Sequence, residues 1–303
     1  MHDQDRPSQH LVDETSPPVS SSTTEPVNRS DTLCRAEFHP VLFYALTFTI
    51  AWTAWAPLLC HVRGVLELPI PYGVALFVCQ TIGAFSPLIS LLFIQRIKCT
   101  PGLVDGVLGK IRLQGVSLRW LLLPAVLPVA IAIATAVVHA LVSGESVSIL
   151  RPETRDELGW ALLLVIPFTF VVSMIGSPFG EEPGWRGYVL DHFAKKGQGY
   201  RGSALVAVLW WTWHIPLFIV LGVPSDGYSF LEMLGHSLLI DSFFLLSSGN
   251  LLSAMLYHQG VNISFIFFAP QTQSIAGLVL LFGIALSLRA TVERRGNLAV
   301  AEP

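Results

Sequence analysis

The sequence predicts an all-α membrane protein, a polytopic transmembrane helical bundle of about eight spans with both termini in the cytoplasm. Of its 303 residues, 52% are hydrophobic and only 13% are charged, whereas soluble domains carry about 25% charged residues. The apolar residues form long runs, each near the roughly 20 residues that a helix needs to cross a bilayer. These runs are too long and too uniformly apolar for barrel strands.

The composition also bounds the partners and the domains. A net charge of −3 argues against a nucleic-acid partner, so the expected surroundings are the lipid bilayer of a membrane that the sequence does not specify. Residues 1–36 are rich in Ser, Thr, Pro and acidic residues, and we expect a disordered polar tail, because such a segment buries too little apolar surface. Residues 37–291 form the predicted membrane domain, and residues 292–303 a short cytoplasmic tail.

The apolar runs define the expected spans. The sixth and seventh are nearly continuous and are separated by Ser247-Ser248-Gly249-Asn250. The eight runs cover residues 41–60, 72–95, 118–142, 158–179, 202–222, 230–248, 250–269 and 273–289.

The basic residues set the expected orientation. Eight spans place Arg63, Arg151 and Arg155 on one side and the other fifteen of the 18 Lys and Arg residues on the side of the N-terminal tail. Cytoplasmic loops are enriched in Lys and Arg. This bias predicts cytoplasmic termini and an even number of spans.

Ionisable residues follow the fourth run, in the segment "SPFGEEPGWRGYVL". Glu182 and Arg186 are four residues apart, a spacing that allows an ion pair on one helix face. Pro178 and Pro183 predict a break there and a new helical stretch from about Pro183. One carboxylate would pair with Arg186, and Glu181 would be free to act on a substrate or water. By themselves, these charges are more typical of a helix cap at the membrane interface than of a catalytic site.

Three further polar residues lie deep in later runs. His214 lies in "WWTWH", and His258 and Asn262 lie in "HQGVN", on one helix face. At 1.5 Å per residue, all three lie roughly 12 to 18 Å along their spans from the same face of the membrane. Packing between helices is the simpler explanation for each alone. Asp241, deep in the sixth run, is a weaker candidate for supporting such a site.

The motifs "EEPGWRGYVL", "WWTWH" and "HQGVN" resemble, in order, those of the CPBP family of intramembrane proteases. This is the CAAX-protease and bacteriocin-processing family, which includes the Rce1-type prenyl-protein endopeptidases and the Abi proteins. The flanks "IGAFSPLISLL", "WHIPLF" and "SGNLLSAMLYH" are also similar, and the resemblance covers roughly residues 40 to 290. One departure is Trp210, where the family often has Phe; we expect it to serve the same packing role.

The resemblance implies an endopeptidase that cleaves a membrane-embedded or lipidated protein, as in CAAX processing of prenylated proteins. It implies that Glu181 is the general base that activates water, with Glu182 and Arg186 supporting its charge and position. His214 would hold the water or act as an acid. His258 and Asn262 would donate hydrogen bonds to the oxyanion. Peptide hydrolysis requires such a base and such donors.

Two alternatives stay open from the sequence. The two histidines and a glutamate also form a plausible zinc set, although the sequence lacks the HExxH pattern; we favour a glutamate mechanism without a cofactor over a metalloprotease. A proton- or ion-coupled transporter would also carry buried Glu, His and Asp residues and a proline-broken helix. The two halves of the chain show no internal repeat, which argues against a transporter.

Overall fold

The computed structural model describes residues 38–144, 146–268 and 274–301, and this part of the chain is helical, without a strand. The predicted tail, residues 1–36, lies outside the described residues. The helices of the described part are α1 (Pro40–Val62), α2 (Tyr72–Ala84), α3 (Ser86–Ile97), α4 (Leu103–Leu108), α5 (Arg119–Ser143), α6 (Pro152–Leu158), the 3₁₀ turn η1 (Gly159–Ala161), α7 (Leu162–Gly176), α8 (Pro178–Glu182), the π-helix η2 (Pro183–Leu190), α9 (Asp191–Lys195), α10 (Gly199–Leu221), α11 (Gly227–Leu246), α12 (Leu251–Phe267) and α13 (Ile275–Ala301).

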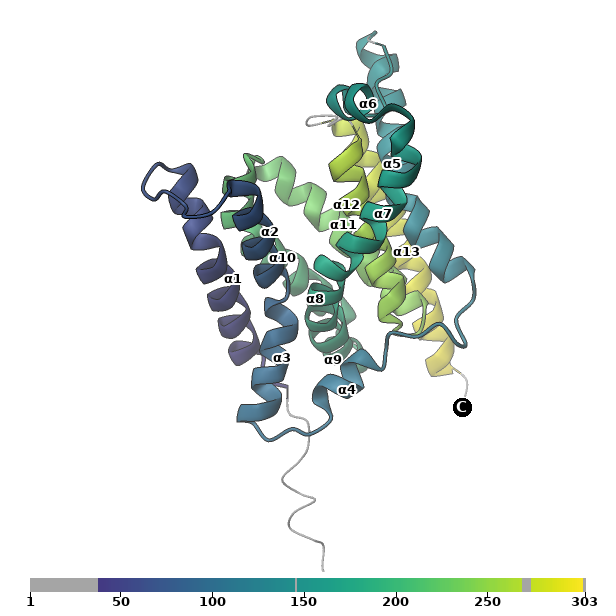
Figure 1. The fold of residues 1–303 in the computed structure, drawn as a ribbon. Helices are drawn as coiled ribbons and strands as arrows, with labels where there is room; N and C mark the ends of the chain where they lie inside the picture. The colour runs from purple at the N-terminus through teal and green to yellow at the C-terminus, as the bar shows by residue number, and fades with distance from the viewer. Residues whose placement is uncertain (1–37, 145, 269–273, 302–303) are drawn as a thin grey trace, which may run out of the picture. The chain divides into compact units, whose positions relative to one another are not determined.

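The helices confirm the all-α membrane class (Figure 1). Within the described residues, six helical stretches are long and apolar enough to cross a membrane. The bent pair α2–α3 is a seventh candidate, and α12, with 17 residues, covers the remaining predicted run. Each of the eight predicted runs falls on one or more of these helices over most of its length. The number of crossings and the cytoplasmic side stay predictions.

Exposed apolar side chains show which surfaces face lipid. Along α7, Leu164, Phe168 and Ile175 are all more than 60% exposed. A soluble protein rarely leaves such a continuous apolar face in water. Helix α7 therefore borders the bilayer on one side, and the chain is an integral membrane protein.

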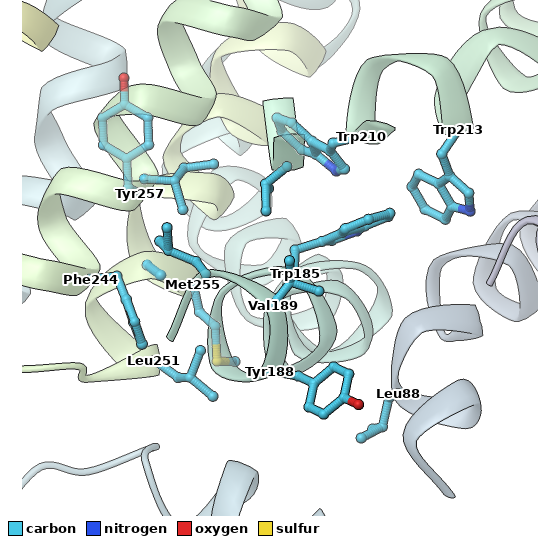
Figure 2. Packing of buried hydrophobic residues seen from close by; sticks show 14 of the residues in the cluster. Leu88, Trp185, Tyr188, Val189, Trp210, Trp213, Phe244, Leu251, Met255 and Tyr257 are labelled. Atoms are coloured by element: carbon cyan, nitrogen blue, oxygen red, sulfur yellow. The ribbon is translucent and has the colours of Figure 1, made fainter. Parts of the chain in front are cut away.

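The buried core lies where η2, α10, α11 and α12 meet. Trp185 and Trp213 are completely buried, with ring centroids 6.0 Å apart. Figure 2 shows Trp185, Trp210 and Trp213 gathered beside η2, with Met255 and Tyr257 on the neighbouring α12. Aromatic rings in such contact contribute more than their buried area alone. This packing holds η2 rigidly against α10.

The α2–α3 pair bends by 45° at Phe85. Pro87, at the start of α3, lacks an amide hydrogen and cannot continue the hydrogen bonding of α2. Gly180 packs against this bend so closely that an added Cβ would lie 2.7 Å from the carbonyl oxygen of Ala84. At Gly184, one turn later, an added Cβ would lie 2.5 Å from the Cβ of Pro87. Small residues thus let α8 and η2 approach the bend.

The fourth predicted run differs from expectation in its extent. Residues Pro152–Lys195 form one helical stretch of 44 residues, so Glu181 does not lie at its end. It lies fourteen residues before Lys195, about 21 Å along the helix. The expected break is present at Ser177, where φ is −135° and ψ is −70°. The stretch after Pro183 is a π-helix where an α-helix was predicted, because Pro183 cannot supply one of the α-type hydrogen bonds.

Polar contacts fix the loop before α5. The Lys110 ammonium donates to Asp191 at 2.7 Å and to the Gly187 carbonyl. Burial lowers the pKa of Lys110, and the hydrogen bond from Lys110 to Asp191 partly offsets this shift.

At the other end of the chain, α13 continues to Ala301. Most of the predicted 292–303 tail is therefore helical.

Candidate active site

Glu181 lies inside the bundle and is only 2% exposed. Its Oε1 accepts a hydrogen bond from Ser177 Oγ, and its Oε2 accepts one from Trp210 Nε1, both at 2.8 Å. Ser177 is the residue at the break between α7 and α8, so the interruption presents a hydroxyl to the carboxylate four residues later. The two donors fix the orientation of the carboxylate.

Glu182 faces a different set of partners. Its Oε1 accepts a hydrogen bond from Arg186 Nη1 at 3.1 Å, which confirms the predicted ion pair at four-residue spacing. The same oxygen lies 2.7 Å from His258 Nδ1. Because a carboxylate can only accept, His258 Nδ1 carries the proton, and Nε2 is left for another partner. Glu182 thus orients His258 in the way a carboxylate orients a catalytic histidine.

Arg186 is completely buried and shared between two carboxylates. Its Nε donates to Asp241 Oδ1 at 2.9 Å, and its Nη2 donates to Ser237 Oγ at 2.7 Å. A buried guanidinium needs such partners, since an unpaired buried charge is strongly destabilising. The structure therefore places Asp241, on α11, in direct contact with Arg186.

Trp210 stands at the centre of the site. Its ring makes edge-to-face contacts with His214 (5.2 Å between centroids) and with His258 (5.3 Å). The Arg186 guanidinium lies 5.0 Å from the same ring, within range of a cation–π interaction. The expectation that Trp210 replaces Phe in packing alone is incomplete, because its indole N–H also holds Glu181.

His214 is fixed by its own helix. Its Nδ1 lies 2.8 Å from the backbone oxygen of Trp210, and its ring stacks on Phe218. A carbonyl oxygen only accepts, so Nδ1 holds the proton and the neutral ring offers Nε2 as an acceptor. This arrangement suits a residue that receives a hydrogen bond from water.

Asn262 completes the set on α12. Its Nδ2 lies 3.5 Å from Ser177 Oγ and 3.5 Å from Gln259 Oε1, so both contacts are at the long limit for hydrogen bonds. Ser177 in turn donates to Glu181. The amide therefore stands one hydroxyl away from Glu181, with its donors weakly engaged.

The structure brings all six predicted residues into one connected cluster, although not with every predicted partner. The resemblance implied that Glu182 and Arg186 support the charge and position of Glu181. Among the contacts of the described residues, neither of them hydrogen-bonds Glu181, and Glu182 instead contacts Arg186 and His258. Sequence reasoning missed Ser177, whose only signal is its place beside Pro178. It also missed the hydrogen bond of Trp210, for which the three-tryptophan run gave no specific sign.

The zinc alternative requires three side-chain donors around one point. Among the described residues, no group of three His, Cys, Asp or Glu side chains is placed to hold a metal ion. His258 directs Nδ1 to Glu182, and His214 directs Nδ1 to its own helix backbone.

Comparison with known families agrees with the three motifs. Residues 162–264 match the family model described as Rce1-like, type II CAAX prenyl endopeptidase. The matched segment runs from α7 into α12 and contains Glu181, Glu182, Arg186, His214, His258 and Asn262. A search of curated proteins gives no significant match. The family predicted from the motifs is confirmed over the segment that carries the site.

Proposed function

We propose, from the match of residues 162–264 to the Rce1-like family, that this chain is an intramembrane endopeptidase that uses Glu181 as its general base. The family supports a CAAX-type intramembrane protease and does not favour a transporter. The observation that carries the assignment of the base is the burial of Glu181 between two hydrogen-bond donors, Ser177 and Trp210.

The geometry supports the following sequence of steps. Glu181 takes a proton from a water molecule that also donates to His214 Nε2, and the water oxygen bonds to the scissile carbonyl carbon. The electron pair of the carbonyl moves to its oxygen. Asn262 Nδ2, and Nε2 of protonated His258, donate hydrogen bonds to this oxyanion. Such donors are among the largest contributors to catalysis in peptide hydrolysis.

Collapse of the tetrahedral intermediate breaks the carbon–nitrogen bond. The proton held by Glu181 passes to the leaving nitrogen, so the base is regenerated and the products are a new carboxyl end and a free amine. Glu182 holds His258 in position through the 2.7 Å contact between its Oε1 and His258 Nδ1. The substrate class we propose is a membrane-bound, prenylated protein, because the matched family is described as prenyl endopeptidases.

The test uses the full-length chain in liposomes and a prenylated CAAX peptide. We expect Glu181→Gln to reduce kcat by about 10²- to 10⁴-fold, the usual contribution of a positioned acid or base. Glu153→Gln is the control, because Glu153 is exposed on α6.

Omission of the prenyl group from the peptide tests the substrate class. Addition of a chelator tests the glutamate mechanism, which predicts that cleavage is undiminished.

Cleavage by Glu181→Gln and by His214→Ala at the wild-type rate would overturn the assignment of the site. Proton-driven solute flux without any proteolysis would instead establish a transporter.

A further inference from the structure

A second feature of the described chain lies away from the candidate active site. It is a cavity of about 320 Å³ beside the start of α5, at the connection between α11 and α12. Its volume is at the lower end of the range of small-molecule sites, about 300 to 1,000 Å³. The cavity is lined by Arg112, Gln114, Gly115, Val116, Ser117, Trp120, Leu246, Ser247 and Ser248.

Backbone and side-chain hydrogen bonds hold the walls of this cavity together. Asn250 Nδ2 donates to the Arg112 carbonyl at 2.8 Å, and the Leu251 amide donates to the Lys110 carbonyl at 3.0 Å. Ser248 adopts a φ of +58°, a strained conformation for a residue with a side chain, and such strain is concentrated at functional sites. The two loops that form the cavity are therefore fixed against each other before any ligand binds.

The charge of the cavity selects an anion. Arg112 is the one charged residue among the nine that line it. A single contact of the guanidinium is seen within the described chain, from Nη2 to the Ser248 carbonyl at 3.2 Å. The hydroxyls of Ser117 and Ser248 and the amide of Gln114 add neutral donors. Guanidinium groups pair preferentially with phosphate and carboxylate oxygens.

The surroundings of the cavity are apolar. Leu113 is 71% exposed, Leu118 is 64% exposed and Leu122 is 55% exposed. The guanidinium of Arg119 lies 5.0 Å from the Trp120 ring, a pairing typical of the interface between lipid and water. An anion-binding pocket beside exposed leucines suits a ligand with a negatively charged head and an apolar body.

We propose that this cavity binds the phosphate-bearing headgroup of an anionic phospholipid, with Arg112 as the principal contact and the acyl chains along Leu118 and Leu122. The apolar surroundings favour a lipid over a soluble phosphate. The proposal is independent of the proteolytic function, because none of the lining residues belongs to the candidate active site.

The experiment measures retained lipid by native mass spectrometry of the purified full-length chain, with phosphatidylglycerol and phosphatidylcholine supplied in equal amounts. We expect the wild type to retain phosphatidylglycerol preferentially. Arg112→Ala should reduce this preference by about tenfold, since a hydrogen-bonded charge contributes at least that factor. Glycerol 3-phosphate at millimolar concentration should not displace the lipid.

Two further variants keep the result interpretable. Arg96→Ala removes an exposed arginine from the end of α3 and should leave the preference unchanged. Ser117→Asp places a carboxylate in the cavity and should abolish the preference for phosphatidylglycerol. The backbone is unchanged in this variant, so the Ser117 carbonyl still accepts from the Trp120 amide. Equal lipid retention by wild type, Arg112→Ala and Ser117→Asp would overturn the proposal. Displacement by glycerol 3-phosphate would overturn the assignment to a lipid.

Discussion

At the scale of single residues, Trp210 has the most specific role beyond the predicted set. Its ring touches both histidines, and its Nε1 donates to Glu181. A phenylalanine would keep an aromatic ring at this position, with less contact area, and would remove the donor. The indole N–H therefore supports the base, whereas the ring contributes packing.

We expect Trp210→Phe to lower kcat by about tenfold or more with little loss of stability, because hydrogen bonds to charged groups contribute about 1.5 to 3 kcal/mol. The measurement is cleavage of the prenylated peptide, together with thermal unfolding in detergent. Trp211→Phe is the matched control, since Trp211 Nε1 has no hydrogen-bond partner in the described part of the chain. Equal activity of Trp210→Phe and wild type would show that the hydrogen bond does not assist the base.

At the scale of elements, the site depends on how closely α8 and η2 approach the bend between α2 and α3. Gly180 directly precedes Glu181, and its Cα faces the backbone of Ala84 and Phe85. Backbone atoms cannot move aside as a flexible side chain can. The contact therefore sets the position of the helical turn that carries the base.

Gly180→Ala should destabilise the protein by about 1 to 3 kcal/mol, the usual cost of overpacking. It should also reduce cleavage, because catalysis is sensitive to displacements of about 1 Å. Gly176→Ala is the control within the same helical stretch, since an added Cβ there meets no atom within 4 Å. Thermal unfolding and peptide cleavage would be measured for both. A wild-type unfolding temperature for Gly180→Ala would mean that the contact is not tight in the folded protein.

At the scale of the whole membrane domain, a buried polar network joins several helices. Glu182 on α8 and Arg186 on η2 connect to Asp241 on α11. Ser203 on α10 lies beside Asp241 and accepts a hydrogen bond from Arg289 of α13 at 3.2 Å. The last helix is thereby linked to the residues behind His258. Within the described residues Glu182 Oε2, Asp241 Oδ2 and Arg289 Nε have no hydrogen-bond partner. The paired atoms of the network still favour one arrangement of the helices, because a buried polar group that loses its partner is costly.

We expect Asp241→Leu to destabilise the domain by about 3 to 5 kcal/mol, because it leaves Arg186 with an uncompensated share of buried charge. Asp241→Asn should cost less, since its side-chain oxygen can still accept from Arg186 Nε. Thermal unfolding in detergent measures the stabilities of the two variants and of the wild type. Ser242→Ala is the control, because the Ser242 hydroxyl donates to Leu238 of its own helix. If Asp241→Leu unfolds at the temperature of Ser242→Ala, the network does not stabilise the fold.

The sequence by itself determined the helical membrane class, the positions of the apolar runs and the identity of six residues that converge. The reason is that these features depend on local properties. A run of apolar residues determines a span, and a spacing of four residues determines a shared helix face, as for Glu182 and Arg186.

Only the tertiary structure decided how those residues are paired. Whether Glu182 supports Glu181 or His258 depends on the approach of α12 to α8, which no spacing along the chain encodes. The depth of Glu181 depends on the continuation of the fourth helix through a π-helical segment, which its buried neighbours stabilise. The donor role of Trp210 depends on the rotation of α10 against α8. Contacts between distant segments are set by packing of the whole bundle, and a local pattern cannot report them.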